Sequence, residues 1–330
     1  MKIAACVSGR ADYAPLVPVI FELEDKGAEV VAINAGFSGG SSQACCKSLA
    51  DGIELLARRF EESRPDLILL LGDRYETLGA ALAATLFGIP IAHIHGGETT
   101  EGSFDDGFRH AVTQLATYHF VSALEHAEIV ARLTDKYHRP GLIPPNIHVV
   151  GAPGLDNIVD LPPREFKQPY FIVTYLPATK SDLSGDWEFI KALESFPEYD
   201  AIWTGVNNDP GSNKIRGSFE GGAFKFVEMH PKRYLSAVKH AACCIGNSSS
   251  FLIEAPALGV PSVNVGDRQK GRLKGPSVFQ ADENALSIRT AINIALAYKG
   301  PFDNPYGGPG ASKRIAEILM AKDGISSVAA

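Results

Sequence analysis

Acidic, basic and histidine side chains cluster directly after two short apolar segments in the first third of the chain. In LLLGDRYE, Asp73 and Arg74 follow an apolar run, and IPIAHIHGGETTEGSFDDGFRHA places His95, Glu98 and Asp105 after another. Carboxylates and imidazoles are the usual side chains for moving protons in catalysis. Because ligands of open α/β sheets bind beyond the carboxyl ends of strands, these residues are predicted to face a ligand.

Each of these groups also has a purely structural interpretation. Asp73 could be only the N-cap of the next helix, and Asp105 and Asp106 could cap the helix that they open. His93 and His95 alternate along a strand, and no further His or Cys follows at a familiar ligand spacing, so no metal site is expected. We predict a polar active-site loop that carries acid and base groups.

A second set of polar residues lies in GNSSSFLIEAPALGVPSVNVGDRQKGR, in the last third of the chain. A strand ends at Gly246, and Ser248 and Ser249 lead into a helix. Hydroxyls and free N–H groups at such a helix start can hold a diphosphate. Glu254, one turn later, is placed to accept hydrogen bonds from a ribose diol, and Arg268 follows the next strand, where it could face the phosphates. A serine-rich cap is common by itself, but this combination is not.

The amino-terminal segment VSGRADY contains a third possible phosphate contact. A strand, a glycine turn and a helix can place backbone N–H groups against a phosphate, and Arg10 would add a cation. An ordinary βα turn explains the segment equally well. Because the segment is not GxGxxG, it gives no indication of NAD binding.

Short β-branched runs alternate with longer Ala- and Leu-rich stretches, which predicts βαβ units and mostly parallel sheets in an α/β fold. Strands are expected at 2–7, 29–35, 67–71, 89–94, 119–121 and 148–150, and then at 170–175, 201–204, 224–228, 243–245 and 262–265. Helices are expected at 13–26, 41–63, 75–87, 105–116 and 125–133, then at 186–195, 231–239, 250–258 and 284–298, with a final helix at 311–320. The proline-rich stretch 156–169 is the expected linker.

Length and composition are typical of a globular protein with more than one domain. The chain has 330 residues, of which 45% are hydrophobic and 21% charged. This length suits two domains of roughly 150 residues each. A net charge of −7 argues against a general nucleic-acid binder, and no apolar run approaches the length of a membrane span. Five cysteines without a CxxC spacing indicate a reduced, cytoplasmic protein without structural zinc.

Several of these segments together resemble a known family. GRADY, GDRYE, HIHGGETTEG with DDGFRHA, VGAPGLDNI and GNSSSFLIEAPALGVPSVNVGDRQKGR are similar to the hydrolysing UDP-N-acetylglucosamine 2-epimerases of bacterial sialic-acid and legionaminic-acid pathways. The resemblance extends from residue 1 to about residue 320. It implies a GT-B type fold, with two Rossmann-like doubly wound domains facing a cleft. The domains would span 1–160 and 161–310, and a helix in 311–330 would return to the first.

The resemblance also implies a reaction and a set of roles. A UDP-2-acetamido sugar, UDP-GlcNAc or a derivative, would be converted through a glycal intermediate to UDP and the free 2-epimer, ManNAc or a derivative. No cofactor or metal is implied, and a homo-oligomer is expected. By motif, the catalytic residues would be Asp73, His95, Glu98 and Asp105, with His95 at a position where some relatives carry glutamate. The UDP-binding residues would be Arg10, Arg74, Asn207, Ser248, Ser249, Glu254 and Arg268.

Two segments depart from the family pattern. Leu176, in VTYLPATKSD, stands where relatives commonly carry a histidine, and INAGFSGGSSQACC replaces a longer loop of the GxHLS type. A leucine can neither donate a hydrogen bond to a phosphate nor transfer a proton. Three alternatives therefore stand beside the hydrolysing epimerase: a non-hydrolysing epimerase, a GT-B glycosyltransferase, and a catalytically impaired nucleotide-sugar binder.

Overall fold

The computed structural model describes residues 1–7, 10–34, 41–103, 105–135, 139, 141–176, 186–204, 217 and 224–321, with only the backbone for 10–12, 186 and 224. It divides the chain into two compact units. The first unit comprises Met1–Glu98, Asp105–Asn157 and Tyr306–Ala330, and the second comprises Thr99–Phe104 and Ile158–Pro305. The short segment Thr99–Phe104 thus packs with the second unit, although both of its neighbours in the chain belong to the first.

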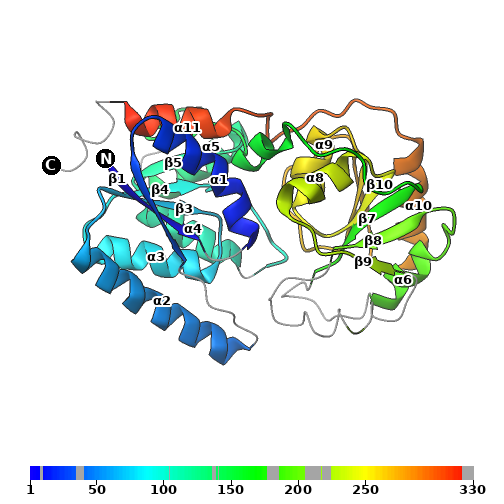
Figure 1. Cartoon of the computed structure of the whole chain (residues 1–330), viewed down its shortest axis with the longest axis horizontal. Helices are drawn as coiled ribbons and strands as arrows, with labels where there is room; N and C mark the ends of the chain where they lie inside the picture. Colours follow the sequence, from blue (N-terminus) through cyan, green and yellow to red (C-terminus); the bar gives the residue numbers. More distant parts are fainter. Residues whose placement is uncertain are drawn as a thin grey trace. The chain divides into compact units, whose positions relative to one another are not determined.

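The first unit is built on a parallel sheet with six strands in the described part of the chain (Figure 1). Its order is β2-β1-β3-β4-β5-β6, so the direction of winding changes between β1 and β3. LILLL in β3 is buried at every position, as expected for a strand covered on both faces. The strands are β1 (Lys2–Val7), β2 (Glu29–Asn34), β3 (Leu67–Leu71), β4 (Ile91–Ile94), β5 (Tyr118–Val121) and β6 (Ile147–Val149).

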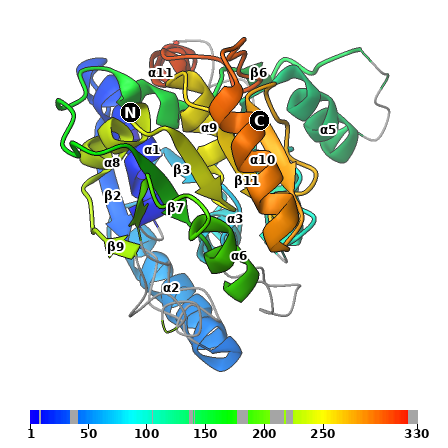
Figure 2. The same ribbon diagram turned by 90° about the vertical axis from the view of Figure 1, so that its right-hand side faces the viewer.

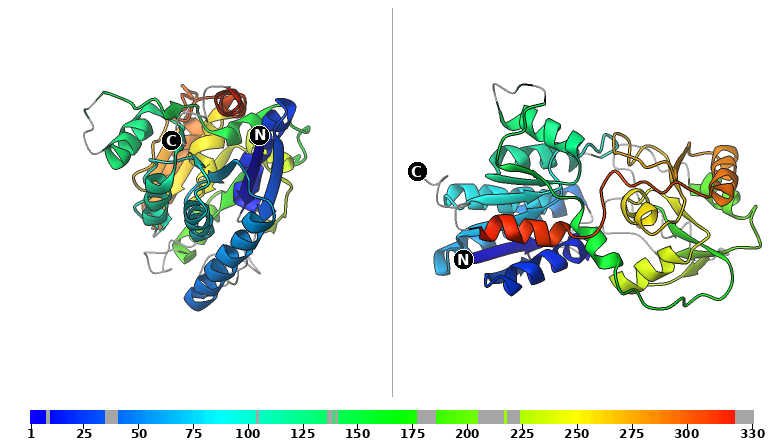
Figure 3. Two further views of the ribbon diagram at one scale, coloured as in Figure 1. Left: turned by 90° about the vertical axis from the view of Figure 1, so that its left-hand side faces the viewer. Right: turned by 90° about the horizontal axis from the view of Figure 1, so that it is seen from above.

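Helices cover both faces of this sheet. They are α1 (Arg10–Asp25), α2 (Ser42–Glu62), α3 (Tyr75–Leu86), α4 (Asp105–Leu115), α5 (Leu124–Thr134) and α11 (Ala311–Met320). Helices α2 to α5 pack in a row, each against the next, whereas α11 lies beside α1 (Figure 3). Ile315 and Leu319 of α11 share an apolar core with Leu16 and Leu23 of α1. The carboxyl-terminal helix therefore completes the core of the first unit.

The second unit has a parallel sheet of the order β12-β11-β10-β7-β8-β9. Numbered within the unit, this is 6-5-4-1-2-3, the order of dinucleotide-binding folds, with its switch point between β7 and β10. The strands are β7 (Tyr170–Thr174), β8 (Asp200–Trp203), β9 (Phe224–Phe226), β10 (Cys243–Gly246), β11 (Ser262–Val265) and β12 (Val278–Ala281).

Two pairs of helices in the described part of the second unit cover its sheet. Helices α6 (Asp186–Leu193) and α10 (Ala285–Ala297) pack together on the face that carries Phe171 and Val173 (Figure 2). Helices α8 (Pro231–Lys239) and α9 (Ser250–Ala257) lie on the other face, where the Tyr170 hydroxyl donates to the Ala237 carbonyl at 2.7 Å. Within the described ranges, no helix of either unit is long and apolar enough to cross a membrane.

Most predicted elements lie within a few residues of the observed ones, and the α/β class is confirmed. Strand β12 was not predicted, because VFQA is a four-residue edge strand with only its last residue buried. A linker was expected from residue 156 onward, but Pro153–Ile158 forms a 3₁₀ helix. The first helix was expected to begin at Tyr13, whereas α1 begins at Arg10.

The two strands at the switch point of the second unit approach very closely at their carboxyl ends. Gly246, the last residue of β10, has a φ of 142°, and a Cβ atom there would lie 1.9 Å from the Thr174 carbonyl oxygen of β7. Only glycine fits such a contact without displacing the backbone. The residues that follow Gly246 are therefore held next to the end of β7.

We predict that Gly246→Ala destabilises the second unit by about 3 kcal/mol, through overpacking against backbone and an unfavourable φ. The matched control is Gly259→Ala, at a φ of 71° with no described atom within 4 Å of the added Cβ, which should cost only about 1 kcal/mol. Both tryptophans, Trp187 and Trp203, belong to the second unit, so urea unfolding followed by tryptophan fluorescence reports this unit alone. Equal losses in the two variants would contradict the close approach at Gly246.

Candidate functional site

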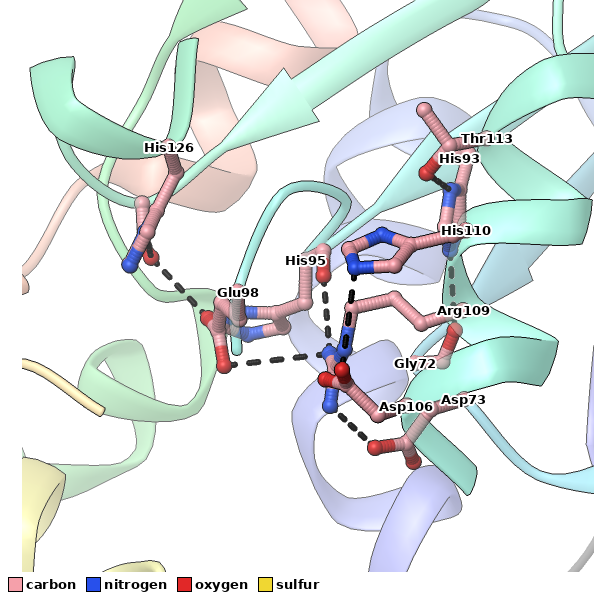
Figure 4. A network of polar contacts seen from close by, with 11 residues as sticks. Gly72, Asp73, His93, His95, Glu98, Asp106, Arg109, His110, Thr113 and His126 are labelled. Carbon is pink, nitrogen blue, oxygen red and sulfur yellow. Dashed lines mark hydrogen bonds and ion pairs between the residues drawn. The ribbon is translucent and has the colours of Figure 1, made fainter. Parts of the chain in front are cut away.

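A buried arginine organises the polar residues of the first unit (Figure 4). Arg109 of α4 is 1% exposed; its Nη2 donates to the Asp73 carboxylate and its Nη1 donates to the His95 carbonyl at 2.9 Å. The same Nη1 lies 3.8 Å from Oε2 of Glu98. Three of the four predicted catalytic residues, from the ends of two neighbouring strands, are thus brought around one guanidinium that the sequence analysis had not selected.

The turn after β3 carries Asp73 into this cluster. Gly72 has a φ of 83°, and α3 begins at Tyr75 with Arg74 as its N-cap. Asp73 is therefore not the N-cap of α3, and that structural interpretation is wrong. The Gly72 carbonyl accepts a hydrogen bond from His93 Nε2 at 2.8 Å. Burial lowers the pKa of His93 to about 3, so the ring is neutral near pH 7 and this contact fixes its proton on Nε2.

Two glycines shape the turn that carries His95 and Glu98. A Cβ on Gly96 would lie 3.1 Å from Thr113 Oγ1, and a Cβ on Gly97 would lie 2.3 Å from the His126 carbonyl oxygen. Gly97 also has a φ of 76°, and His95 has a φ of 64°, which is uncommon for a residue with a side chain. The turn packs against α4 and α5 at these points, which explains the sequence HGGE.

His95 and Glu98 form a tight pair at this turn. His95 Nδ1 and Glu98 Oε1 are 2.5 Å apart, and the Glu98 side chain is 1% exposed. Ser122 Oγ lies 3.0 Å from the same Oε1 and 2.9 Å from His126 Nδ1. Ser122 and His126 were missed by the sequence analysis, although Ser122 directly follows β5, the same strand-end position that identified the other residues.

The two remaining predicted residues of this region differ in their surroundings. Asp105 is the first residue of α4, four residues before Arg109, and therefore lies on the same helix face. Its neighbour Asp106 faces His110 instead, at 3.7 Å. The Arg74 guanidinium pairs with the buried Glu76, through Nε at 3.2 Å and Nη2 at 3.3 Å. A role for Arg74 in UDP binding stays a prediction.

In the second unit, Asn247 holds together the segments at the switch point. It is 1% exposed, and its side-chain amide accepts from the Leu176 N–H at 2.7 Å and donates to the Leu176 carbonyl at 2.8 Å. Its own carbonyl accepts from Arg268 Nη1 at 3.1 Å and Gln269 Nε2 at 2.9 Å. The predicted phosphate ligand Arg268 is thereby fixed beside the end of β10, because the carbonyl that it binds belongs to the residue before Ser248.

The serines at the start of α9 form the rest of this site. Ser249 is the N-cap, with a φ of −60°, and its hydroxyl makes no capping bond in the described part of the structure. Ser248 Oγ accepts from the Ser250 N–H at 3.3 Å, and Ser250 Oγ accepts from the Tyr234 hydroxyl at 3.0 Å. Glu254 lies one turn along the same helix. A helix start with hydroxyls and an arginine at a switch point is a suitable anion site.

Two predicted UDP contacts fall outside this description. Arg10 is the first residue of α1, but its side chain lies outside the described residues, as does the whole of Asn207. Both stay predictions. No group of three His, Cys, Asp or Glu side chains is placed to hold a metal ion, as far as the described residues extend.

The segment between Glu98 and Asp105 packs on the loop that carries Arg268. The Glu101 N–H donates to the Lys270 carbonyl at 3.0 Å, and Lys270 Nζ lies 3.4 Å from a Glu101 carboxylate oxygen. A Cβ on Gly102 would lie 2.3 Å from the Asp267 carbonyl oxygen. Residues 99–103, which follow Glu98, therefore pack against the loop that carries Arg268.

Known proteins with similar sequences and folds agree on one family. A sequence profile described as UDP-N-acetylglucosamine 2-epimerase matches residues 19–320. Polysialic acid biosynthesis protein P7 of Escherichia coli is 33% identical over 292 residues, which cover 81% of this chain and 72% of that protein. The hydrolysing UDP-N,N'-diacetylbacillosamine 2-epimerase of Legionella pneumophila is 30% identical over 304 residues, which cover 84% of this chain and 78% of that enzyme.

A solved structure shows the same fold. The UDP-GlcNAc 2-epimerase of Methanocaldococcus jannaschii, in complex with UDP-GlcNAc and UDP, matches with a TM-score of 0.80 over 97% of this chain and 99% of that one. At 19% identity, this likeness shows the fold alone. The prediction of two Rossmann-like domains of the GT-B type is confirmed.

We predict that Arg109→Met destabilises the first unit by about 3–5 kcal/mol, because it leaves carboxylates in the protein without their buried cation. The control Arg132→Met removes an exposed arginine of α5 and should change the free energy of unfolding by less than about 0.5 kcal/mol. Urea unfolding followed by far-UV circular dichroism, beside tryptophan fluorescence for the second unit, separates the two transitions. A first-unit transition unchanged in Arg109→Met would show that the guanidinium does not hold the cluster together.

Proposed function

The chain belongs to the UDP-N-acetylglucosamine 2-epimerase family, and we propose that it is a hydrolysing member. Its substrate would be a UDP-2-acetamido sugar, UDP-GlcNAc or a derivative, and its products UDP and the free 2-epimer. The observation that carries this proposal is the cluster around Arg109, which gathers two carboxylates and an imidazole at the ends of β3 and β4. Two relatives that are named as hydrolysing enzymes, each 30% identical to this chain, support the assignment to the hydrolysing branch.

The proposed reaction needs three kinds of group. A base must take the proton from carbon 2, a charge stabiliser must assist the departing diphosphate, and a polar group must direct water onto the resulting glycal. Asp73, His95 and Asp105 are the proposed acid, base and water-directing groups, and Glu98 supports them from behind. Arg109 places a positive charge beside the Asp73 and Glu98 carboxylates.

The diphosphate is assigned to the second unit. Ser248, Ser249 and the N–H groups at the start of α9 would bind its oxygens, and Arg268 would neutralise its charge. Glu254 would accept hydrogen bonds from the ribose.

The substrate sugar, the cellular location and the oligomeric state are also proposed. Leu176 offers only backbone groups to a ligand, and Asn247 already binds both of them, so recognition at this position differs from relatives with a histidine. Two relatives are named as hydrolysing 2-epimerases of nucleotide-linked N,N'-diacetylbacillosamine, so UDP-N,N'-diacetylbacillosamine is a second substrate to test. A cytoplasmic location is consistent with free Cys6, Cys45, Cys46, Cys243 and Cys244, and a homo-oligomer is proposed by analogy with the family.

Incubation in deuterated water tests the proposed reaction. UDP-GlcNAc and UDP-N,N'-diacetylbacillosamine are supplied separately, and the products are followed by NMR. We expect UDP and a free 2-epimer that carries deuterium at carbon 2 for at least one substrate. A UDP-linked epimer would indicate the non-hydrolysing reaction. Binding of UDP without exchange at carbon 2 would indicate a glycosyltransferase or a binding protein instead.

We predict that Asp73→Asn and Arg268→Ala have complementary effects. Asp73→Asn keeps the shape but not the charge beside Arg109, and should lower kcat by about 10²-fold or more while leaving the Kd for UDP within about twofold. Arg268→Ala should raise the Kd for UDP by about 10- to 100-fold, because it removes a charged hydrogen bond to the diphosphate. Calorimetric titration with UDP and steady-state kinetics measure both. Loss of UDP affinity in Asp73→Asn would indicate a structural role for Asp73.

A further inference from the structure

Three buried side chains of the first unit and the partly buried His95 form one continuous chain of hydrogen bonds, and Figure 4 shows His95, Glu98 and His126. His126 Nδ1 lies 2.9 Å from Ser122 Oγ, Ser122 Oγ lies 3.0 Å from Glu98 Oε1, and Glu98 Oε1 lies 2.5 Å from His95 Nδ1. The other Glu98 oxygen faces Arg109 Nη1 at 3.8 Å. Glu98 is 1% exposed, whereas the side chain of His95 is 12% exposed. The chain therefore runs from the interior to its most accessible member, His95.

The direction of each hydrogen bond follows from the number of protons available. Glu98 beside Arg109 is a carboxylate, which only accepts hydrogen bonds. Ser122 has one hydroxyl proton and donates it to Glu98, so the contact with His126 requires that His126 Nδ1–H donate to Ser122. His95 must likewise donate its Nδ1–H to Glu98. All donors point toward the carboxylate, and this arrangement fixes the tautomers of both histidines.

The tautomer of His95 determines what its other nitrogen can do. A neutral ring that carries its proton on Nδ1 has a lone pair on Nε2. This Nε2 has no hydrogen-bond partner among the residues that the structure describes. A neutral imidazole with a free nitrogen, held from behind by a carboxylate, is the arrangement of a general base.

We propose that His95 Nε2 is the base that removes the carbon 2 proton, and that Glu98, Ser122 and His126 are positioning residues that act through it. This inference rests on the proposed epimerase function. Glu98 is too deeply buried to reach a sugar itself and instead stabilises the imidazolium that forms. Asp73 is less suited to the role, because its carboxylate is engaged in a hydrogen bond with Arg109.

The step balances as an elimination. The carbon 2–hydrogen bond breaks and its proton moves to His95 Nε2. The electron pair of that bond forms the carbon 1–carbon 2 double bond of the glycal, and the bond from carbon 1 to the diphosphate oxygen breaks, so that UDP departs with its electron pair. The imidazolium then donates Nδ1–H to the Glu98 carboxylate and Nε2–H outward, until it returns the proton to solvent.

Paired substitutions separate the base from its supports. His95→Asn places an amide N–H near the former Nδ1 and can still donate to Glu98, but it has no base at the Nε2 position. His126→Asn likewise retains a donor toward Ser122, whereas His126→Leu and Ser122→Ala interrupt the chain. The matched control is His230→Gln, which changes an exposed histidine of the second unit.

We predict that His95→Asn lowers the rate of carbon 2 deuterium exchange by about 10²- to 10⁴-fold with the Kd for UDP unchanged. Ser122→Ala and His126→Leu should each lower kcat about tenfold with little change in KM, and His126→Asn and His230→Gln should be close to wild type. Exchange at the wild-type rate in His95→Asn would overturn the proposal. A raised KM together with a lowered kcat in Ser122→Ala would also overturn it. So would a kcat of His126→Asn that is as low as that of His126→Leu.

A second measurement tests the hydrogen-bond chain without any substrate. In protein labelled with ¹⁵N-histidine, the ring ¹⁵N shifts distinguish the two tautomers, and the signals are assigned with the histidine variants. We expect His95 and His126 in the Nδ1–H form, and a change at His126 in Ser122→Ala. An Nε2–H tautomer at His95 would refute the assignment of the base. If this tautomer is correct but the wild-type protein exchanges neither UDP-sugar at carbon 2, the proposed function fails rather than the hydrogen-bond chain.

Discussion

The candidate site of the first unit depends on one buried cation. Taking a guanidinium out of water costs several kcal/mol, and the cost is offset only when carboxylates and carbonyls occupy its donor directions. Arg109 finds these partners at Asp73, the His95 carbonyl and Glu98. Because the guanidinium is planar and its donors are fixed, the ends of β3 and β4 and the start of α4 must lie in one arrangement.

In the second unit, a neutral side chain fixes the polar groups of the candidate site. At its switch point the amide and the carbonyl of Asn247 make hydrogen bonds to Leu176, Arg268 and Gln269. A neutral centre is suited to a place where the proposed ligand supplies negative charge itself. The cation beside it, Arg268, donates a hydrogen bond from Nη1 to the Asn247 carbonyl. The two units thus illustrate two ways of fixing polar groups beyond the ends of parallel strands.

Local patterns in the sequence identified the strand ends, and with them most of the site. Buried strands such as LILLL are easily predicted, because both of their faces are apolar. The topology of a parallel sheet then places the polar residues that follow these strands at one edge of the sheet. Family motifs then added roles that spacing alone does not give. The family assignment itself is confirmed by the sequence profile.

The residues that were missed depend on contacts between distant parts of the chain. Arg109 lies 36 residues after Asp73, and helical spacing does not reveal which strand end a helix side chain will meet. Ser122 and His126 follow β5 in the uninformative text VSALEH, and their importance comes from a carboxylate 24 residues earlier. The sequence of segment Thr99–Phe104 does not indicate that it packs with residues near 270. The catalytic and UDP-binding roles of all eleven predicted site residues stay predictions.

The path of Thr99–Phe104 restricts how this protein can be recombined with its relatives. A chimera joined near residue 158 would combine the amino-terminal part of one protein with the carboxyl-terminal part of another, and it would carry the segment 99–104 of the first parent into the foreign loop 266–272. Gly102 against Asp267, and Thr99 against Gly271, leave no space for a mismatch there. A stable chimera therefore requires both stretches to come from the same parent, as if they were a single gene fragment interrupted by the rest of the chain.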